Sequence, residues 1–330
     1  MNATNFRALL VNQEENTFSV NISNLTLNDL PEGEVVIRVD YSSVNYKDGL
    51  ASIPNGKIVN SYPHVPGIDL AGTVVSSKDP RFKEGDEVIA TSYEIGVSHF
   101  GGFSEYARIR ADWIVPLPKG LSMKEAMTYG TAGFTAALSI QRLEENGINP
   151  EKGPILVSGS TGGVGSSAVS MLAKLGYHVI ASTGKESEHE FLNEIGANEI
   201  ISREELQPEK IRPMDKPRWA AAIDPVGGNT LAYILSTIKY GGSVAVSGLT
   251  GGISVPTTVF PFILRGVNLL GIDSVYCPMS TRIKLWERMA NDLKPDNLEK
   301  ITSEITLDQL PSTLSLILEG KVKGRTVLKL

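Results

Sequence analysis

Residues 153–185 read GPILVSGSTGGVGSSAVSMLAKLGYHVIASTGK, and this segment gives the clearest indication of fold class in the chain. The short apolar run Ile155–Val157 predicts a buried parallel strand. A glycine-rich turn follows, and then a helix that Gly176 ends. A second strand, Tyr177–Ala181, completes a unit of about 30 residues, the length of a βαβ crossover. This order predicts a dinucleotide site, because backbone N–H groups at the helix N-terminus can hold a pyrophosphate.

The glycine turn departs from the usual G-x-G-x-x-G pattern. If Gly162 and Gly165 are its second and third glycines, Ser160 holds the first place. A literal match, Gly163-x-Gly165-x-x-Ala168, would put its last member deep in the helix. A tight turn without a ligand is the alternative. Because strand, turn, helix and strand stand in the required order, we favour cofactor binding.

The residues after the second strand indicate which dinucleotide binds. NAD sites usually place an Asp or Glu at the end of this strand, where it bonds the ribose 2′-OH. Here Ser182-Thr183-Gly184-Lys185 follows the strand, and the first acid is Glu186. Small hydroxyls with the cations Lys185 and Arg203 suit a 2′-phosphate. The sequence therefore favours NADPH over NADH, unless both cations are merely solvated surface charges.

The composition is that of a globular protein with one large or two smaller domains. The chain has 330 residues, of which 41% are hydrophobic and 21% charged. Its net charge of −6 argues against nucleic acid as a partner. We expect no membrane partner, because no signal-peptide pattern and no apolar run of about 18 residues is present. The single cysteine, Cys277, excludes an intrachain disulfide and suits a cytoplasmic location.

Turn residues punctuate the first part of the chain, up to residue 127, and predict a mostly β, barrel-like domain. The expected strands are Phe6–Val11, Glu34–Tyr41, Gly67–Ser76, Asp86–Ala90 and Phe103–Ile109.

From about Lys124 onward, helical and strand patterns alternate, which predicts an α/β class with a doubly wound, six-stranded parallel sheet. The later strands are expected at Glu199–Ser202, Ala220–Asp224, Ser243–Gly248 and Leu269–Val275. After an amphipathic helix over Thr281–Leu293, the tail from Ile301 should rejoin the first domain. Ligand sites are expected in the cleft at the carboxyl ends of the strands, which selects the runs 224–228, 247–250 and 271–274, although turn chemistry alone could explain them.

Several motifs resemble the medium-chain dehydrogenase/reductase superfamily over essentially the whole chain. They are the glycine turn, VDYSSVNYKD (39–48), PGIDLAG (66–72), GGFSEY (101–106) and GTAGFTA (130–136). Residues 45–48 and the run LRGVNLLGIDSV (264–275) resemble, more narrowly, the zinc-independent quinone oxidoreductases that include acryloyl-CoA reductases. The resemblance implies a GroES-like catalytic domain at 1–127 and 277–330 and an NADP-binding Rossmann domain at 128–276.

The zinc-dependent members of this superfamily bind their ion through a Cys in the first block, the His of a Gly-His-Glu motif and a third ligand. Here Asn45 and its neighbours supply no thiolate, and Gly67-Ile68-Asp69 replaces Gly-His-Glu. The histidines are scattered, and we expect His64 and His99 to be surface or lightly buried residues. Because zinc needs ligands at set spacing, the sequence predicts no metal.

Without a Lewis acid, we expect hydride transfer to an acceptor that is already electrophilic, such as a quinone or the conjugated C=C bond of an enone or acryloyl-CoA-like thioester. The charge that develops on its carbonyl oxygen needs donors, and the carbanion needs a proton. The candidates are the Asn45 amide, the Tyr46 hydroxyl and Lys47, with Asp48 to orient them or relay a proton. In the alternative, this block is a helix start with Asn45 as its N-cap.

The resemblance also implies where the cofactor binds. It assigns the nicotinamide to Thr131, Thr135, Ser247, Gly248, Ile272 and Ser274. It assigns the pyrophosphate to Gly162, Gly163 and Val164, with Ser160 as a variant of the first glycine, and the 2′-phosphate to Ser182, Thr183, Lys185 and Arg203. The ends of the fourth and fifth strands add Asp224 and Leu249 as candidates.

Two other functions remain open: a zinc-free alcohol or aldehyde reductase, and a non-catalytic NADPH-binding protein. In this superfamily the sixth strand commonly pairs with its copy in a second subunit. The apolar edge at residues 269–272 would suit such a homodimer.

Overall fold

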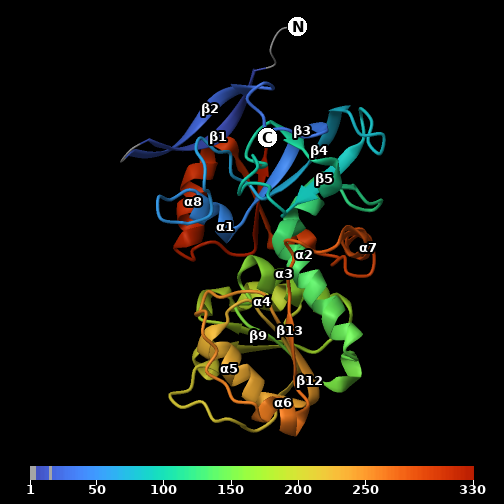
Figure 1. Cartoon of the computed structure of the whole chain (residues 1–330). Helices are drawn as coiled ribbons and strands as arrows, with labels where there is room; N and C mark the ends of the chain where they lie inside the picture. The colour runs from blue at the N-terminus through green and yellow to red at the C-terminus, as the bar shows by residue number, and fades with distance from the viewer. Residues whose placement is uncertain (1–4, 15–16) are drawn as a thin grey trace. The chain divides into compact units, whose positions relative to one another are not determined.

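The computed structural model describes residues 5–14 and 17–330, and the chain divides into two compact units (Figure 1). The first unit runs up to Thr131 and includes Val275–Ala290 and Thr302–Leu330. The second unit comprises Ala132–Ser274 and Asn291–Ile301.

The segment Asn291–Ile301 differs from the predicted domain division, because it groups with the second unit. Two polar contacts tie it there: Lys174 Nζ donates to Asp296 Oδ1 at 2.6 Å, and Asn297 Nδ2 donates to the Glu194 carbonyl at 2.9 Å. Such contacts depend on tertiary structure, which the sequence pattern does not reveal.

The second unit contains a six-stranded parallel sheet in the order β10-β9-β8-β11-β12-β13. This confirms the predicted doubly wound class, since the order is 3-2-1-4-5-6 by position in the chain. The strands are β8 (Ile155–Val157), β9 (Val179–Thr183), β10 (Glu199–Ser202), β11 (Trp219–Asp224), β12 (Ile238–Val246) and β13 (Asn268–Gly271). The helices are α3 (Gly163–Lys174), α4 (His189–Glu194), α5 (Gly228–Thr237) and α6 (Phe260–Arg265), together with the carboxyl-terminal part of α2 (Met123–Glu145).

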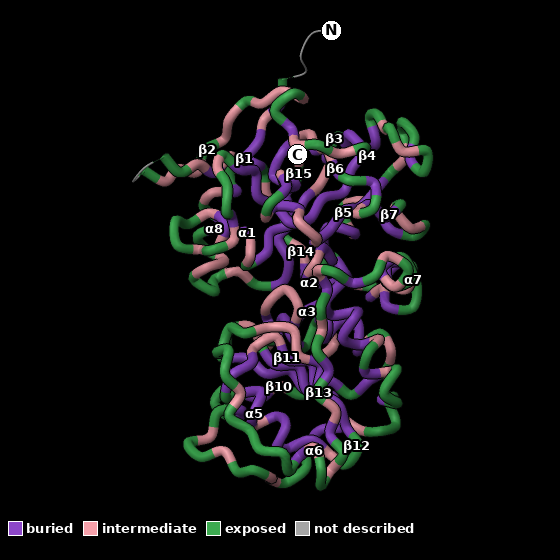
Figure 2. Tube along the Cα trace, viewed as in Figure 1, coloured by how far each residue is buried: buried purple, intermediate pink, exposed green. Residues whose placement is uncertain are grey.

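Apolar runs form the core of this unit. Every residue of β8, β9 and β11 is buried (Figure 2), as expected for parallel strands covered on both faces. Leu231, Ile234 and Leu235 of α5 pack in one apolar cluster with Leu156 and Val244 of the sheet. The core therefore fixes where each strand ends, and the strand ends position the site.

The first unit is built on a seven-stranded sheet and a two-stranded hairpin. The sheet order is β14-β15-β3-β4-β5-β7, and β6 pairs with β3. The strands are β1 (Asn5–Glu14), β2 (Thr17–Thr26), β3 (Val35–Val44), β4 (Asp69–Ser77), β5 (Glu87–Thr91), β6 (Tyr106–Ile109), β7 (Ile114–Pro116), β14 (Thr302–Thr306) and β15 (Arg325–Lys329). The helices are α1 (Tyr46–Ala51), α7 (Met279–Ala290) and α8 (Leu310–Leu318), with the start of α2. The tail supplies β15, which pairs with β3 as the predicted return to this domain requires.

The strand β2 was not predicted, although Phe18, Val20 and Ile22 alternate with polar residues in its sequence. None of its residues is fully buried (Figure 2), but Val20 and Ile22 pack as partly buried side chains against an apolar cluster of the first unit. It pairs with β1 along its whole length, from Thr17 opposite Glu14 to Thr26 opposite Asn5. The period-2 pattern of a strand was therefore present in the sequence and was missed.

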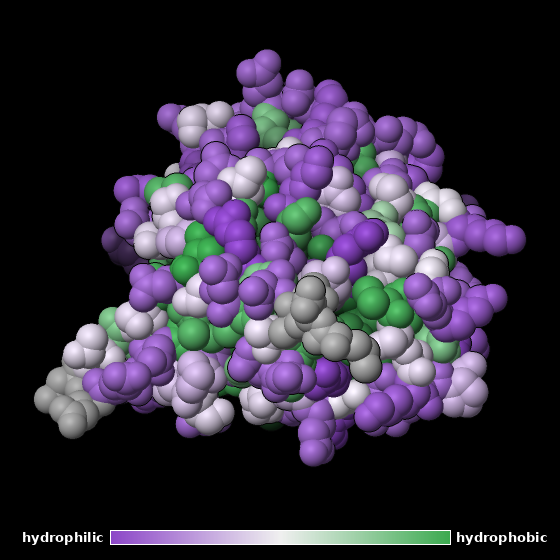
Figure 3. Space-filling model, turned by 90° about the horizontal axis from the view of Figure 1, so that it is seen from above, coloured by the Kyte–Doolittle hydropathy of each residue, from purple (hydrophilic) through white to green (hydrophobic). Residues whose placement is uncertain are grey.

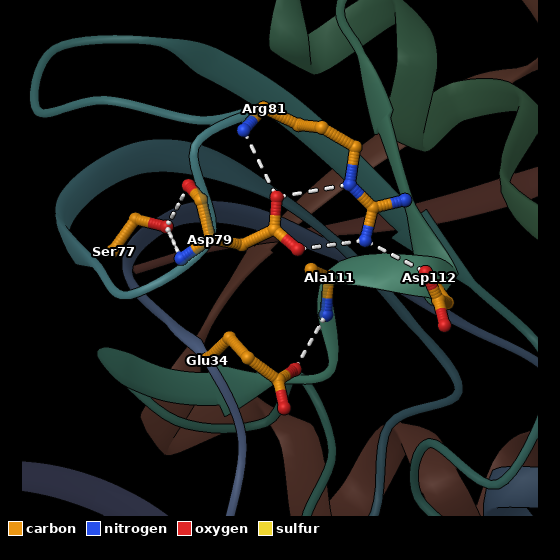
Figure 4. Close-up of polar contacts among 6 residues, drawn as sticks. All are labelled: Glu34, Ser77, Asp79, Arg81, Ala111 and Asp112. Atoms are coloured by element: carbon orange, nitrogen blue, oxygen red, sulfur yellow. Dashed lines mark hydrogen bonds and ion pairs between the residues drawn. The ribbon is translucent and has the colours of Figure 1, made fainter.

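A polar network holds the turn after β4 against the 3-10 turn η1 (Ala111–Trp113) (Figure 4). Arg81 donates to Asp79 from Nε at 2.9 Å and from Nη2 at 2.8 Å, and also to Asp112 Oδ1 at 2.7 Å. Glu34 Oε2 accepts from the Ala111 N–H at 3.0 Å. The hydrogen bonds from Arg81 lower the pKa of Asp79 to about 2.

Hydrophilic side chains cover most of the face shown in Figure 3, with smaller hydrophobic areas between them. Within residues 5–14 and 17–330, no helix combines the length and apolar character that a membrane crossing requires.

Candidate functional site

Three glycines shape the turn between β8 and α3. Gly159 has a φ of +55°, a left-handed conformation that glycine adopts at no steric cost. A Cβ on Gly165 would overlap the Gly159 carbonyl oxygen, so only glycine lets the helix approach the turn this closely. Gly162 is the N-cap of α3 and contributes no side-chain hydrogen bond. The first N–H groups of the helix therefore have no N-cap side chain as acceptor, as a pyrophosphate site requires.

The glycine pattern puts Ser160 at the position of its first glycine, which makes the sharp turn, but the structure gives Ser160 another role. Its Oγ donates to the Val157 carbonyl at 2.7 Å and accepts from the Ser182 N–H at 3.0 Å. The side chain is fully buried and ties the turn to β9. The glycine of the sharp turn is Gly159, one residue earlier, whereas Gly163 and Val164 begin α3 as the pattern predicts.

A cavity of about 290 Å³ opens where the strand ends of the second unit meet. Three of the predicted cofactor residues line it: Ser182, Thr183 and Arg203. Val226 and Thr250 lie in the runs 224–228 and 247–250 that the sequence analysis selected, and Gly159 and Thr161 belong to the glycine turn. The remaining lining residues were not singled out as ligand-binding from the sequence: Ser158, Gly184, Leu206, Gln207, Thr230 and Gly251. Of the segment after β10, only Arg203 was predicted.

The lining fits the adenosine end of a 2′-phosphorylated dinucleotide. Thr183 Oγ1 accepts from the Lys185 N–H at 3.0 Å, so its own proton can go to a ligand oxygen. Arg203 brings a positive charge, and no carboxylate of the described chain lines the cavity. Arg203 and Thr183 would therefore hold a 2′-phosphate. Lys185 lies outside the lining, and its backbone starts the next turn.

The predicted residues at the end of β11 are used within the protein. Asp224 is fully buried and accepts hydrogen bonds from the Ser158 hydroxyl and, at 2.9 Å, from the Gly227 N–H. Burial raises the pKa of its carboxyl group. The carboxylate thus closes the turn before α5. A Cβ on Gly248 would overlap the Pro225 carbonyl oxygen, so Gly248 allows two loops to touch.

Ser247 stands out among the predicted nicotinamide residues. Its Oγ is buried and finds no hydrogen-bond partner among the residues that the structure describes. An orphaned polar atom at a strand end suits a bond to a ligand. Thr135 Oγ1 donates to Ser274 Oγ at 2.8 Å, which brings two further predicted residues together. Ile272 pairs with β12 through its backbone N–H, and Leu249 is largely exposed.

A second group of polar residues is buried in the first unit around Asp69, at the start of β4. Asp69 Oδ2 accepts from Ser43 Oγ at 2.6 Å, from Asn45 Nδ2 at 2.8 Å and from the Thr131 N–H at 2.9 Å. Asp69 Oδ1 accepts from Thr131 Oγ1 at 2.5 Å. Arg325 of β15 donates from Nη2 to Ser43 Oγ at 2.9 Å. We call Ser43, Asn45, Asp48, Asp69, Thr131 and Arg325 the Asp69 cluster.

Sequence reasoning named Asn45, Asp48 and Thr131 of this cluster but missed Asp69 as a site residue. The available signal was an acid inside the PGIDLAG motif, at the start of a strand otherwise rich in small and apolar residues. Its partners come from β3, α2 and β15, so their proximity depends on strand register.

Asn45 also binds the second carboxylate of the cluster. Its Nδ2 lies 3.2 Å from Asp48 Oδ2, and its backbone N–H donates to the same oxygen at 2.8 Å. Asn45 is the N-cap of α1, so the alternative interpretation as a helix start describes its backbone. Two carboxylates surround the amide nitrogen, so both amide protons are engaged. Donation to a substrate oxygen, as the sequence predicts, would require one of these bonds to be exchanged.

Asp48 is fully buried, and this sets its protonation. Desolvation, and then the charge of Asp69, raises the pKa of its carboxyl group to about 7. The Ile68 N–H donates to its Oδ1 at 3.0 Å. Two buried carboxyl groups face one buried guanidinium in this cluster, so a proton on Asp48 balances the charge. Of the other predicted catalytic residues, Tyr46 is 48% exposed and Lys47 is half-buried on α1.

Helix α2 is interrupted at Gly130, beside the cluster. The residue has φ +50° and ψ −155°, far from helical values. A Cβ there would lie 2.5 Å from Asp69 Oδ2 and 2.9 Å from Arg325 Nη2. The missing side chain therefore makes room for the charged groups. The break also lets the Thr131 N–H bond Asp69 in place of a helix carbonyl.

The structure describes no group of three or more His, Cys, Asp or Glu side chains that could hold a metal ion within residues 5–14 and 17–330. Ile68 occupies the motif position of the zinc-binding His, and only its backbone contacts Asp48. The prediction that His64 and His99 are surface or lightly buried residues was wrong, because they are only 1% and 7% exposed. His64 pairs with Val11 through its backbone, and desolvation lowers the pKa of its ring to about 4.

Family models and known proteins agree with this geometry. The alcohol dehydrogenase GroES-like domain matches residues 31–119, and the zinc-binding dehydrogenase model matches residues 163–291. The chain is 58% identical to the Bacillus subtilis protein YhfP, which is named a quinone oxidoreductase, over 99% of this chain and 100% of the relative. It is 50% identical to acrylyl-CoA reductase AcuI of Ruegeria pomeroyi over 98% of each chain.

Solved structures give the same result. The crystal structure of YhfP with NAD bound has a TM-score of 0.98 to this chain, at 58% identity, over 99% of this chain and 100% of the other. The YhdH oxidoreductase from Salmonella enterica in complex with NADP has a TM-score of 0.95 at 47% identity, over 98% and 99%.

Proposed function

Because this chain belongs to the medium-chain dehydrogenase/reductase superfamily of oxidoreductases, in the subgroup of YhfP, YhdH and AcuI, we propose that it is an NADPH-dependent reductase of activated acceptors. The acceptor would be a quinone or the conjugated C=C bond of an enone or acryloyl-CoA-like thioester. The observation that carries the proposal is the Asp69 cluster with its neighbour Ile68. Asn45 of the cluster and Ile68 stand at motif positions of zinc ligands, and they present an amide and an alkyl side chain there.

The chemistry follows from these residues. NADPH, when bound, supplies a hydride. The acceptor must already be electrophilic, because the motif positions of the metal ligands hold an amide and an alkyl group. Tyr46 and Lys47, on the accessible side of α1, would donate to the carbonyl oxygen on which charge develops. A pKa of about 7 lets Asp48 hold a proton that the reduced acceptor needs.

The cofactor preference has its own support. Arg203, Ser182 and Thr183 line the cavity without any accompanying carboxylate of the described residues. An acid would be expected at this strand end if the ribose 2′-OH were to be bound. Among the relatives, NADP accompanies YhdH and NAD accompanies YhfP. Titration with both reduced nucleotides tests the preference directly.

The decisive experiment is an acceptor panel with NADPH. We expect oxidation of NADPH with acryloyl-CoA, a simple enone or benzoquinone, and at least about tenfold slower oxidation with a simple aldehyde. Faster turnover of the aldehyde would replace the proposal with a zinc-free aldehyde reductase. NADPH binding without turnover of any acceptor would indicate a non-catalytic nucleotide-binding protein.

A single variant tests the assignment of the donor. Tyr46→Phe removes one hydroxyl, and we expect kcat to fall about a hundredfold while the NADPH dissociation constant is unchanged. Tyr240→Phe is the matched control, because Tyr240 is exposed and belongs to β12 of the other unit. Full kcat in Tyr46→Phe would remove Tyr46 from the mechanism.

We also propose a homodimer through β13, the edge strand of the sheet in the second unit. Leu269 on β13 and Ile263 and Leu264 on α6 are exposed apolar side chains, which is costly unless another surface covers them. Light scattering after size exclusion should give the dimer mass. Ile263→Asp should give the monomer mass, and Ser187→Asp, at an exposed polar position, should remain dimeric. A monomeric wild type would refute this assembly.

A further inference from the structure

Gly184 follows β9 and faces the side chain of Arg203. A Cβ built on Gly184 would lie 2.8 Å from each of three guanidinium atoms, Nε, Cζ and Nη2 of Arg203. Equal distances to three atoms of one planar group indicate that the plane lies face-on over Gly184. The guanidinium therefore fills the volume that any larger residue at position 184 would occupy.

The strand pairing fixes the backbone of both residues. Ser202 of β10 is paired with Thr183 of β9, and the Arg203 N–H donates to the Thr183 carbonyl at 2.9 Å. Only the side chain of Arg203 can therefore move away. Gly184 does not adopt a left-handed φ, so alanine would fit its backbone without strain. A methyl group at this position would displace the guanidinium and leave the fold intact.

The charge of Arg203 is available to a ligand. No ion pair joins its guanidinium to a carboxylate anywhere in residues 5–14 and 17–330. The neighbouring Glu204, whose pKa is lowered by hydrogen bonds and then by the charge of Arg203, lies outside the cavity lining. Both Gly184 and Arg203 line the cavity, beside the hydroxyls of Ser182 and Thr183. A dianionic phosphate on the ribose would gain a charge-assisted bond here that a 2′-OH cannot match.

We propose that Gly184 is a specificity-determining residue, because it provides the space in which the Arg203 guanidinium lies flat at the 2′-phosphate position. This inference deepens the proposed function and rests on its NADPH preference. Gly184 acts through Arg203 and needs no contact of its own with the nucleotide.

The test measures binding, independently of turnover. NADPH and NADH dissociation constants are measured by fluorescence titration, and 2′,5′-ADP and 5′-AMP serve as competitors that lack the nicotinamide. The variants are Gly184→Ala, Arg203→Ala and the double variant. Arg212→Ala is the control for loss of one exposed charge, because Arg212 is exposed in the same unit and lies outside the cavity lining.

We expect Gly184→Ala to weaken NADPH and 2′,5′-ADP about tenfold and to leave NADH and 5′-AMP within about twofold. In the Arg203→Ala background, Gly184→Ala should have no further effect, since its target is gone. An unchanged NADPH-to-NADH ratio in Gly184→Ala, or an undiminished effect in the double variant, would overturn the inference. A wild type that prefers NADH would overturn both the inference and the proposed cofactor. NADPH-selective binding without reduction of any acceptor would overturn only the proposed reaction.

Discussion

Asp48→Asn offers the sharpest test of the Asp69 cluster, because it removes a carboxyl group that titrates and therefore changes how stability depends on pH. The pKa of the Asp48 carboxyl group rises from 3.8 to about 7 in the fold. The folded chain then binds a proton that the unfolded chain has released between these two pH values. Stability from this group is complete below pH 3.8 and is lost as pH rises toward 7. The loss is at most about 1.4 kcal/mol per pH unit.

The measurement is urea unfolding of wild type and Asp48→Asn at pH 5, 6, 7 and 8. Comparison at each pH cancels the titrations that the two proteins share. The asparagine does not ionise, so the variant should gain about 2 kcal/mol relative to wild type between pH 5 and 7 and little beyond pH 8. If Asp48→Asn also loses the hydrogen bond from the Ile68 or the Asn45 N–H, the free energy of unfolding changes by the same amount at every pH. Stability curves that stay parallel from pH 5 to 8 would refute a proton on Asp48.

Three further results are expected. Asp69→Asn should lower the free energy of unfolding by about 3–5 kcal/mol in urea, because Arg325 would lose the larger of the two carboxylate charges that act on it, and an amide nitrogen cannot accept the buried hydrogen bonds that the Asp69 oxygens accept; a loss below 1 kcal/mol would contradict this. Gly165→Ala should cost about 1–3 kcal/mol and weaken NADPH in titration, since its Cβ would meet the Gly159 carbonyl; normal binding would argue against the tight turn. Asp79, whose pKa the hydrogen bonds from Arg81 lower to about 2, should stabilise the fold above pH 3.8 and lose this effect as pH falls to 2. Acid unfolding of Arg81→Ala should lack that step.

Much of the fold could be predicted because its strands are short and apolar. Each buried strand of the second unit is a run such as Ile155–Val157, bounded by turn residues, so order along the chain suffices to count strands. The strand β2 carries an alternation of apolar residues at Phe18, Val20 and Ile22 that was missed, but its register depends on its partner β1. The segment Asn291–Ile301 could not be placed from the sequence, because it is held by side-chain contacts with residues far along the chain.

Part of the cavity lining could likewise be predicted from the sequence, and part could not. Ser182 and Thr183 could be predicted because they end a strand, and Arg203 because it follows the neighbouring strand. Gln207 and Thr230 are joined across the cavity rim by a 3.3 Å hydrogen bond, and no local pattern links them. For Asp69, the residue type was visible but its partners were not. Asn45 was predicted as a site residue, but the direction of its amide protons depends on the carboxyl groups of Asp48 and Asp69 around it.

The break in α2 at Gly130 and the buried charges of Asp69 and Arg325 depend on each other. A designer who straightens α2 with a better helix former there would drive a methyl group into the carboxylate and the guanidinium together. The reverse also holds. If the Asp69 cluster were built into another scaffold, the helix break at Gly130 would have to be built in with it, because a side chain there would overlap the cluster. A search for stabilised variants should therefore leave Gly130 unchanged.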